Sequence, residues 1–395
     1  MALSTNPRRK TKGIERRHDL IALVLQGGGA LGAYQAGVYE ELSGTDYQPD
    51  WIVGVSIGAI NAALIAGNAP ATRVERLSEF WHTVSSGMGL HIDKAADPLW
   101  STTPSGLPHP RRAFNQFSAL CSAMLGISGF YQPRVPPAPF QQEGTLGALG
   151  IYDTAPLRAT LDRLIDFDLI NSKKIRLSVG AVNVTSGNSE YFDNADRIIG
   201  PDHIMASAAL PPAFPPVMID GQPYWDGGIV SNTPLQYLLD TRGKRSLLAL
   251  QVDLFNARGA LPVNLAGVQQ RQKDIIYSSR TRYNSNMATE IANARKALRD
   301  LLLKLPAELQ RDVSVQTLIE AARTAPADIV HLIYRQASYE LESKDYEFSR
   351  MSVLEHWQAG RCDVRDTIEH PGWLKSSGLD EGVTQYDLTR HSRPV

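Results

Sequence analysis

Short apolar runs alternate with helix-like stretches over the first part of the chain. Ile21–Gln26 is an apolar run with β-branched residues that ends at three glycines, which predicts a buried strand. Ala30–Leu42 carries apolar residues at helical spacing and predicts a helix. Trp51–Val53 predicts a second buried strand, and the alanine-rich Ala59–Ala66 predicts a buried helix. Strands that alternate with helices predict a mainly parallel sheet covered by helices on both faces.

The alternation is interrupted between residues 85 and 150. This segment is rich in Pro, Gly and Ser, which predicts an insertion over one end of the sheet, of the kind that forms lids or binding loops. Its apolar residues predict either the wall of a groove or a small local core: Phe117, Leu120, Met124, Leu125, Ile127, Phe130 and Tyr131. Regular structure then resumes with a helix near Pro156–Asp166, a strand at Lys174–Val184, a hairpin over Val217–Trp225 and a last strand at Ser246–Leu254.

From about residue 265 the pattern changes to longer helical stretches. They are predicted at Leu265–Lys304, at Glu308–Thr324 and from Ser349 into the 360s, with a strand-like Ile329–Tyr334 between them. We therefore expect three parts: a flexible basic tail (1–18), a main α/β domain (19–256) that contains the insertion (85–150), and a mostly helical extension (257–395). The extension has no nucleophile-like motif, and packing, pairing with a second copy or surface docking are its expected roles.

Composition and charge exclude several classes of protein. Hydrophobic residues make up 43% of the 395 residues and the formal net charge is −1, which is not typical of a nucleic-acid-binding protein. The basic tail is the local exception, and its alternative role is weak contact with anionic lipid head groups. Cys121 and Cys362 are far apart and lack metal-ligand spacing, which argues against a disulfide framework or a zinc site.

Two further absences in the sequence bear on location. No apolar run reaches the ~18 residues that a membrane-spanning helix needs, and the start of the sequence does not have the pattern of a signal peptide. We therefore expect a cytoplasmic protein, with peripheral membrane contact as its only association with a bilayer.

The first chemical motif lies between the second strand and its helix. Gly54-Val55-Ser56-Ile57-Gly58 has the form G-x-S-x-G, in which a serine occupies a sharp strand-to-helix turn. Glycines two positions before and after Ser56 let strand and helix pass closely. A helix that starts directly after Ser56 points its free N–H groups and its positive dipole end at developing negative charge. The alternative is a tight connection in which Ser56 only caps the helix.

A second glycine motif follows the first strand. The backbone N–H groups of Gly27, Gly28 and Gly29 can converge on an anion without interference from side chains. Gly27–Gly32 also matches the dinucleotide fingerprint G-x-G-x-x-G, but the acidic residue that this fingerprint needs after the second strand is absent, because the serine motif stands there. The phosphate-loop pattern fails as well, because Ala33 occupies the position of its lysine.

A serine needs a base within hydrogen-bond reach. The histidines after residue 250 are His331, His356, His370 and His391, and none follows a predicted strand in an evident loop. Asp226, by contrast, stands at the exit of the predicted hairpin with Gly227 and Gly228 behind it. The alternatives are that Asp226 only caps its own turn and that Asp253, at the end of the last strand, is the base.

These motifs, in this order, resemble those of the patatin-like phospholipases. The run from Ala206-Ser207-Ala208 to Pro215-Pro216 is similar to the segment that precedes the aspartate in that family, and the resemblance covers about Leu20–Leu254. It implies a three-layer α/β/α sandwich and hydrolysis of lipid acyl esters without a metal or other cofactor. It also implies a role for each motif residue: Ser56 as nucleophile, Asp226 as proton acceptor, Gly27, Gly28 and Gly29 as oxyanion hole, and Gly32, Gly54, Gly58, Gly227 and Gly228 as motif support.

Three questions stay open after the resemblance. Many members of the family carry a basic residue where this chain has Leu31, which bears on head group and rate. A polyester (polyhydroxyalkanoate) depolymerase or a short-chain esterase would use the same dyad, and a lipid-surface scaffold would use none of it. The extension is similar to one found on a bacterial subset of patatin-like proteins, and homo-oligomerisation through it is an expectation. The groove of the insertion would hold an acyl chain.

Overall fold

A computed structural model describes residues 18–85, 110–322, 325–337, 340, 343–370 and 382–388. The expected basic tail lies outside these residues except for His18, and so does the first part of the expected insertion, 86–109.

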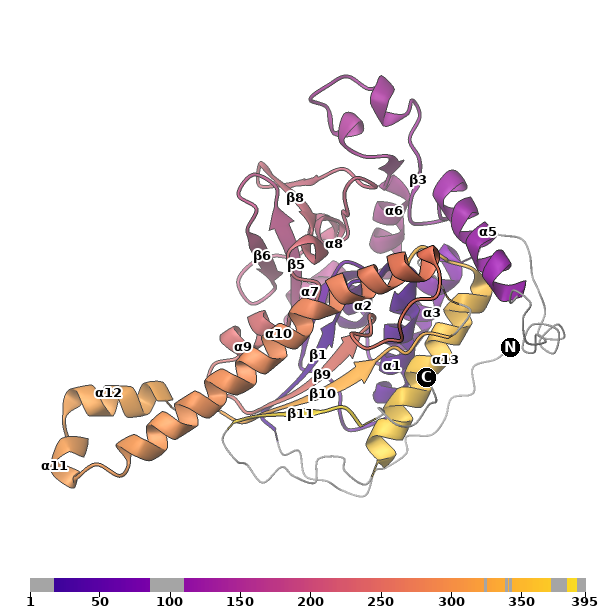
Figure 1. Cartoon of the computed structure of the whole chain (residues 1–395). Coiled ribbons are helices and arrows are strands. Elements are labelled where there is room, and N and C mark those ends of the chain that lie inside the picture. The colour runs from indigo at the N-terminus through magenta and orange to yellow at the C-terminus, as the bar shows by residue number, and fades with distance from the viewer. Residues whose placement is uncertain are drawn as a thin grey trace.

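A single large sheet organises the chain, as Figure 1 shows. Its strand order is β11-β10-β9-β1-β2-β5-β8-β7, and β6 pairs with β5. Pairing is parallel from β11 through β5 and antiparallel among β5, β6, β7 and β8, so the expected mainly parallel sheet is confirmed. The bounds are β1 Leu20–Leu25, β2 Trp51–Val55, β5 Arg176–Asn183, β6 Ser189–Asp193, β7 Val217–Ile219, β8 Gln222–Asp226, β9 Leu247–Asp253, β10 Ala327–Ile333 and β11 Val383–Tyr386.

The alternation of side chains along β1 divides the core into two layers. Ile21, Leu23 and Leu25 belong to one apolar cluster, and Leu20, Ala22 and Val24 belong to another on the opposite face. Every residue of β1 is buried, as expected of a strand covered on both faces. The three-layer α/β/α arrangement is therefore confirmed.

Helices cover both faces of the sheet. The first cluster includes residues of α1 (Gly32–Ser43), α2 (Ile57–Ala66), α3 (Arg73–Val84) and α6 (Ala155–Leu164), and the second includes α9 (Leu235–Thr241). Two shorter helices are α7 (Phe167–Asn171) and α8 (Pro201–Ser207).

The described part of the insertion contains α5 (Pro110–Leu125), β3 (Gln132–Pro133) and the short 3₁₀ turns η3 (Ala138–Phe140) and η4 (Leu146–Leu149). β3 pairs with β4 (Tyr152–Asp153), which follows the insertion. The apolar residues of this segment divide into two groups. Ile127, Phe130 and Tyr131 are buried, whereas four side chains of α5 are more than half exposed: Phe117, Leu120, Met124 and Leu125.

The C-terminal region is mostly helical, as expected, but it also extends the sheet. The long helix α10 (Leu265–Leu302) crosses in front of the sheet and carries α11 (Ala307–Gln310) and α12 (Val313–Ala322) away from the body (Figure 1). β10 then pairs in parallel with β9 at the edge of the main sheet. The main sheet therefore continues beyond residue 257.

The last long helix, α13 (Arg350–Glu369), packs directly against α1. Glycines permit the close approach: a Cβ on Gly37 would lie 1.9 Å from the carbonyl oxygen of Trp357, and one on Gly360 would lie 2.1 Å from that of Tyr34. The Tyr34 hydroxyl donates to Asp363 at 2.8 Å. No helix among the described residues is both long and apolar enough to cross a bilayer.

Candidate active site

Ser56 lies on the sharp turn between β2 and α2. Its φ of 58° and ψ of −128° place it in a backbone region that residues other than glycine rarely adopt. A Cβ on Gly54 would lie 2.4 Å from the carbonyl oxygen of Gly58, and one on Gly58 would lie 2.3 Å from that of Leu25. The two motif glycines thus allow the strand and the helix to cross at a distance that no side chain would tolerate.

The end of α8 supports this turn. The backbone N–H of Ser56 donates to both the carbonyl oxygen and the Oγ of Ser207, each at 3.1 Å. Ser207 Oγ in turn donates to the carbonyl oxygen of Gly180 on β5 at 2.6 Å. Sequence reasoning named Ser207 only as part of the run that resembles the family and gave it no role, because a lone serine in a small-residue helix carries no chemical signal.

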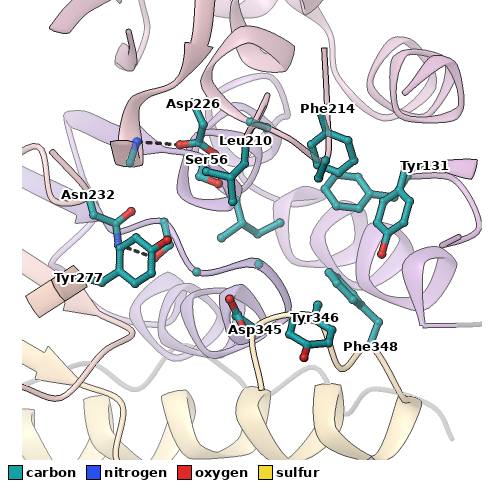
Figure 2. A pocket seen from close by; sticks show the side chains of 18 of the residues that line it. Ser56, Tyr131, Leu210, Phe214, Asp226, Asn232, Tyr277, Asp345, Tyr346 and Phe348 are labelled. Carbon is teal, nitrogen blue, oxygen red and sulfur yellow. Dashed lines mark hydrogen bonds between the residues drawn. The ribbon is translucent and has the colours of Figure 1, made fainter. Parts of the chain in front are cut away.

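Asp226 is the last residue of β8, and its side chain lies next to Ser56 (Figure 2). The carboxylate is almost completely buried and accepts a hydrogen bond from the Gly228 N–H at 2.7 Å. Burial raises the pKa of Asp226 to about 7, although the neighbouring Ser56 side chain and the Gly228 N–H act to lower it. The structure therefore brings together the serine and the aspartate that the sequence nominated from separate motifs.

The three glycines after β1 differ in their hydrogen bonds. The Gly27 N–H donates to the carbonyl oxygen of Asn232 at 3.2 Å, and Asn232 Nδ2 donates to the carbonyl oxygen of Gly27 at 3.0 Å. The N–H groups of Gly28 and Gly29 donate to no other group of the described chain, and both residues line the same cavity as Ser56. The Gly27 N–H is thus already hydrogen-bonded within the protein, and two of the three expected N–H donors are available to a ligand. Sequence reasoning did not single out Asn232.

The rival bases lie elsewhere. Asp253 accepts from Gln251 Nε2 and lies 3.3 Å from His331 Nδ1, and His356 pairs with Glu340 at 2.6 Å. None of these residues lines the cavity at Ser56. His391 lies outside the described residues. In the part of the chain that the structure describes, no cluster of His, Cys, Asp or Glu side chains is arranged to hold a metal ion.

A cavity of about 300 Å³ opens beside Ser56 and Asp226. Aromatic residues from several segments line it, among them Phe130, Tyr131, Tyr152, Phe214, Tyr346 and Phe348. Figure 2 shows Tyr131, Phe214, Tyr346 and Phe348 around the cavity. Tyr131 and Phe214 pack with ring centroids 5.3 Å apart. Phe130 and Tyr131 come from the apolar group predicted to form a groove, whereas the four exposed side chains of α5 do not line the cavity.

The C-terminal region also contributes to the cavity. Tyr277 of α10 and the segment with Asp345, Tyr346 and Phe348 lie in its wall. Sequence reasoning missed all four, because these residues carry no motif and lie far from Ser56 in the sequence.

The chain has a mainly parallel sheet between helical layers. It also has a serine on a glycine-flanked turn and a buried aspartate beside a glycine-rich loop. These features are typical of α/β proteins built on a nucleophile-elbow turn. A family model described as patatin-like phospholipase matches residues 23–239. This is more than half of the chain, and the protein belongs to the patatin-like phospholipase family. A second family model, described as patatin phospholipase, matches residues 275–378.

Comparison with solved structures finds the crystal structure of VipD from Legionella pneumophila, with 15% sequence identity and a TM-score of 0.36. The match covers 88% of this chain and 66% of that one, so the chain spans just under two thirds of the VipD structure's length. A similarity at this level carries no argument about activity. No curated protein matches the chain significantly.

Proposed function

We propose that the protein is a lipid acyl hydrolase, a carboxylic ester hydrolase of the phospholipase A or lysophospholipase type. Ser56 is the nucleophile and Asp226 is the proton acceptor. The observation that supports this assignment is the position of the Asp226 carboxylate, which lies next to Ser56, is almost completely buried and has a pKa raised to about 7. A base with a pKa near the working pH combines a useful ionised fraction with a useful affinity for the proton.

The acylation step follows from this geometry. Asp226 accepts the proton of Ser56 Oγ as that oxygen attacks the carbonyl carbon of the ester. The N–H groups of Gly28 and Gly29 hold the resulting oxyanion, and the N-terminus of α2 adds its positive dipole end. When the tetrahedral intermediate collapses, the C–O bond to the alcohol breaks and the alcohol leaves with the proton from Asp226.

Deacylation repeats the same sequence with water. Asp226, again ionised, accepts a proton from a water molecule that attacks the acyl-enzyme carbonyl. Collapse of the second tetrahedral intermediate breaks the bond to Ser56 Oγ, the proton returns from Asp226 to that oxygen, and the free acid leaves. No cofactor takes part in either half of this cycle.

The cavity favours an acyl chain as the group that binds beside Ser56. Eight of the 21 residues that line the cavity are aromatic, and apolar walls with a few placed polar groups are typical of small-molecule sites. Phe117, Leu120 and Met124 recur at helical spacing on the exposed face of α5, and Ala123 of the same helix lines the cavity. This apolar stripe supports peripheral contact with a lipid surface, which vesicle sedimentation of a Leu120→Ser/Met124→Ser variant would test; unchanged binding would contradict it.

The experiment that tests the proposal is active-site labelling with a fluorophosphonate, together with hydrolysis of phospholipid, neutral-lipid, short-chain ester and polyhydroxyalkanoate substrates. Wild type should react with the fluorophosphonate and hydrolyse the lipid esters. Ser56→Ala and Asp226→Asn should each abolish both the labelling and the hydrolysis. Asp253→Asn is the matched control, a buried carboxylate outside the cavity that should leave labelling intact. Full activity of folded Ser56→Ala would refute the assignment. Labelling that persists in Asp226→Asn but is lost in Asp253→Asn would refute Asp226 as the base.

A further inference from the structure

The C-terminal region crosses the glycine-rich loop with one short segment, residues 343–348, which we call the strap. Three of its residues line the cavity beside Ser56: Asp345, Tyr346 and Phe348. Figure 2 shows all three on the side of the cavity opposite Asp226. The strap comes almost 300 residues after the serine in the sequence, and it lies within the region matched by the second family model.

The strap touches the loop that carries the two available N–H donors. The carbonyl oxygen of Asp345 accepts the N–H of Ala30 at 2.8 Å, immediately after Gly29. Gly29 has a φ of 54°, and a Cβ built on it would lie only 2.0 Å from that same oxygen. The loop is thus packed against the backbone of the strap at Gly29, the residue next to Gly28.

Two ion pairs tie the strap to neighbouring positions of α10. Lys273 Nζ lies 2.8 Å from Asp345 Oδ1, and the ammonium group also lies 5.4 Å from the ring centroid of Tyr346. Lys344 Nζ lies 2.7 Å from Asp274 Oδ1, and both of these side chains are almost completely buried. Because consecutive residues of the strap pair with consecutive residues of α10, the two bonds together restrict both rotation and sliding of the strap.

We propose that the strap and its ion pairs to α10 position the oxyanion loop, and that the C-terminal region thereby completes the catalytic site. An oxyanion hole is effective only when its donors are oriented before the reaction. The Asp345–Ala30 hydrogen bond holds the loop at the residue next to these donors, and Lys273 holds Asp345. Lys273, Asp345 and Lys344 are positioning residues, and this role rests on the proposed hydrolase function.

The test compares Lys273→Met and Asp345→Asn with the charge-swapped double variant Lys273→Asp/Asp345→Lys. Arg335→Met is the matched control, because Arg335 pairs with Asp387 at 3.1 Å in the same region with similar exposure. Hydrogen exchange of the peptide that contains Ala30 measures the loop directly, and kcat and KM for a lipid ester measure its consequence. Each single variant should raise exchange at Ala30 and lower kcat about tenfold with little change in KM, less than the ~10²–10³-fold cost of losing a donor.

Partial recovery of both readouts in the charge-swapped variant would support the proposal, because a general loss of packing would not be rescued. Unchanged exchange at Ala30 in both single variants would overturn it. Exchange that rises throughout the chain, or equally in Arg335→Met, would also overturn it and leave the pairs a merely structural role. A wild type that hydrolyses no ester, but whose Ala30 exchange depends on Lys273, would support the strap contact and refute the hydrolase proposal alone.

Discussion

Replacement of Asp226 by asparagine should stabilise the protein while it removes activity. The carboxyl group is almost completely buried, and burial raises its pKa from 3.8 to about 7. A shift of about three pH units, at ~1.4 kcal/mol per unit, corresponds to a free energy on the order of 4 kcal/mol. This is the cost of ionising the carboxyl group inside the folded protein rather than in the unfolded chain. Asparagine has no charge to bury, and its Oδ1 can still accept the Gly228 N–H.

The sign of the effect depends on pH. Because the folded-state pKa lies above the unfolded one, the contribution of Asp226 to stability is complete below 3.8 and is lost as the pH rises through about 7. The gain in free energy of unfolding from Asp226→Asn should therefore reach about 4 kcal/mol at pH 8 and only about 2 kcal/mol at pH 5. Over the same range, hydrolysis by wild type should fall about tenfold for each pH unit below about 7, since the protonated carboxyl group cannot act as a base.

Denaturant unfolding of both proteins at pH 5 and pH 8 measures the first effect, and the pH dependence of kcat/KM measures the second. Asp312→Asn is the control, because that carboxylate is exposed and hydrogen bonds from Ser314 lower its pKa, so its replacement should give no gain at high pH. An Asp226→Asn variant that gains no more stability at pH 8 than at pH 5, together with a flat rate profile, would refute the reasoning.

Three further predictions concern the surroundings of the site. Gly29→Ala should lower kcat by two orders of magnitude or more, because its Cβ would lie 2.0 Å from the Asp345 carbonyl oxygen; near-normal kcat would contradict this contact. Ser207→Ala should lower kcat while the midpoint of the pH profile stays in place, because it removes a support of the Ser56 backbone and not the base; a shifted midpoint would argue otherwise. Phe348→Ala should reduce the free energy of unfolding by about 3 kcal/mol and shift preference toward longer or bulkier acyl groups; an unchanged chain-length profile would exclude Phe348 as a wall of the acyl site.

The sequence alone determined the parts of this protein that depend on local sterics and periodicity. The apolar runs predicted β1, β2 and β9, and the glycine spacing around Ser56 predicted a turn that the φ of this residue then shows. These features could be predicted because neighbouring residues are enough to specify a buried strand or to exclude a side chain from a close crossing.

The tertiary structure decided which groups meet and what their surroundings do to them. Burial among segments distant in the sequence raises the pKa of Asp226, and the backbone of Asn232 occupies the Gly27 N–H. The pattern predicted a strand-like Ile329–Tyr334 in the mostly helical C-terminal region, but not that this strand would pair with β9 or that Asp345 would lie against the glycine loop. No local pattern carries this information, because burial and long-range hydrogen bonds are properties of the packed molecule, in which each group acquires its partners only when the whole chain has folded.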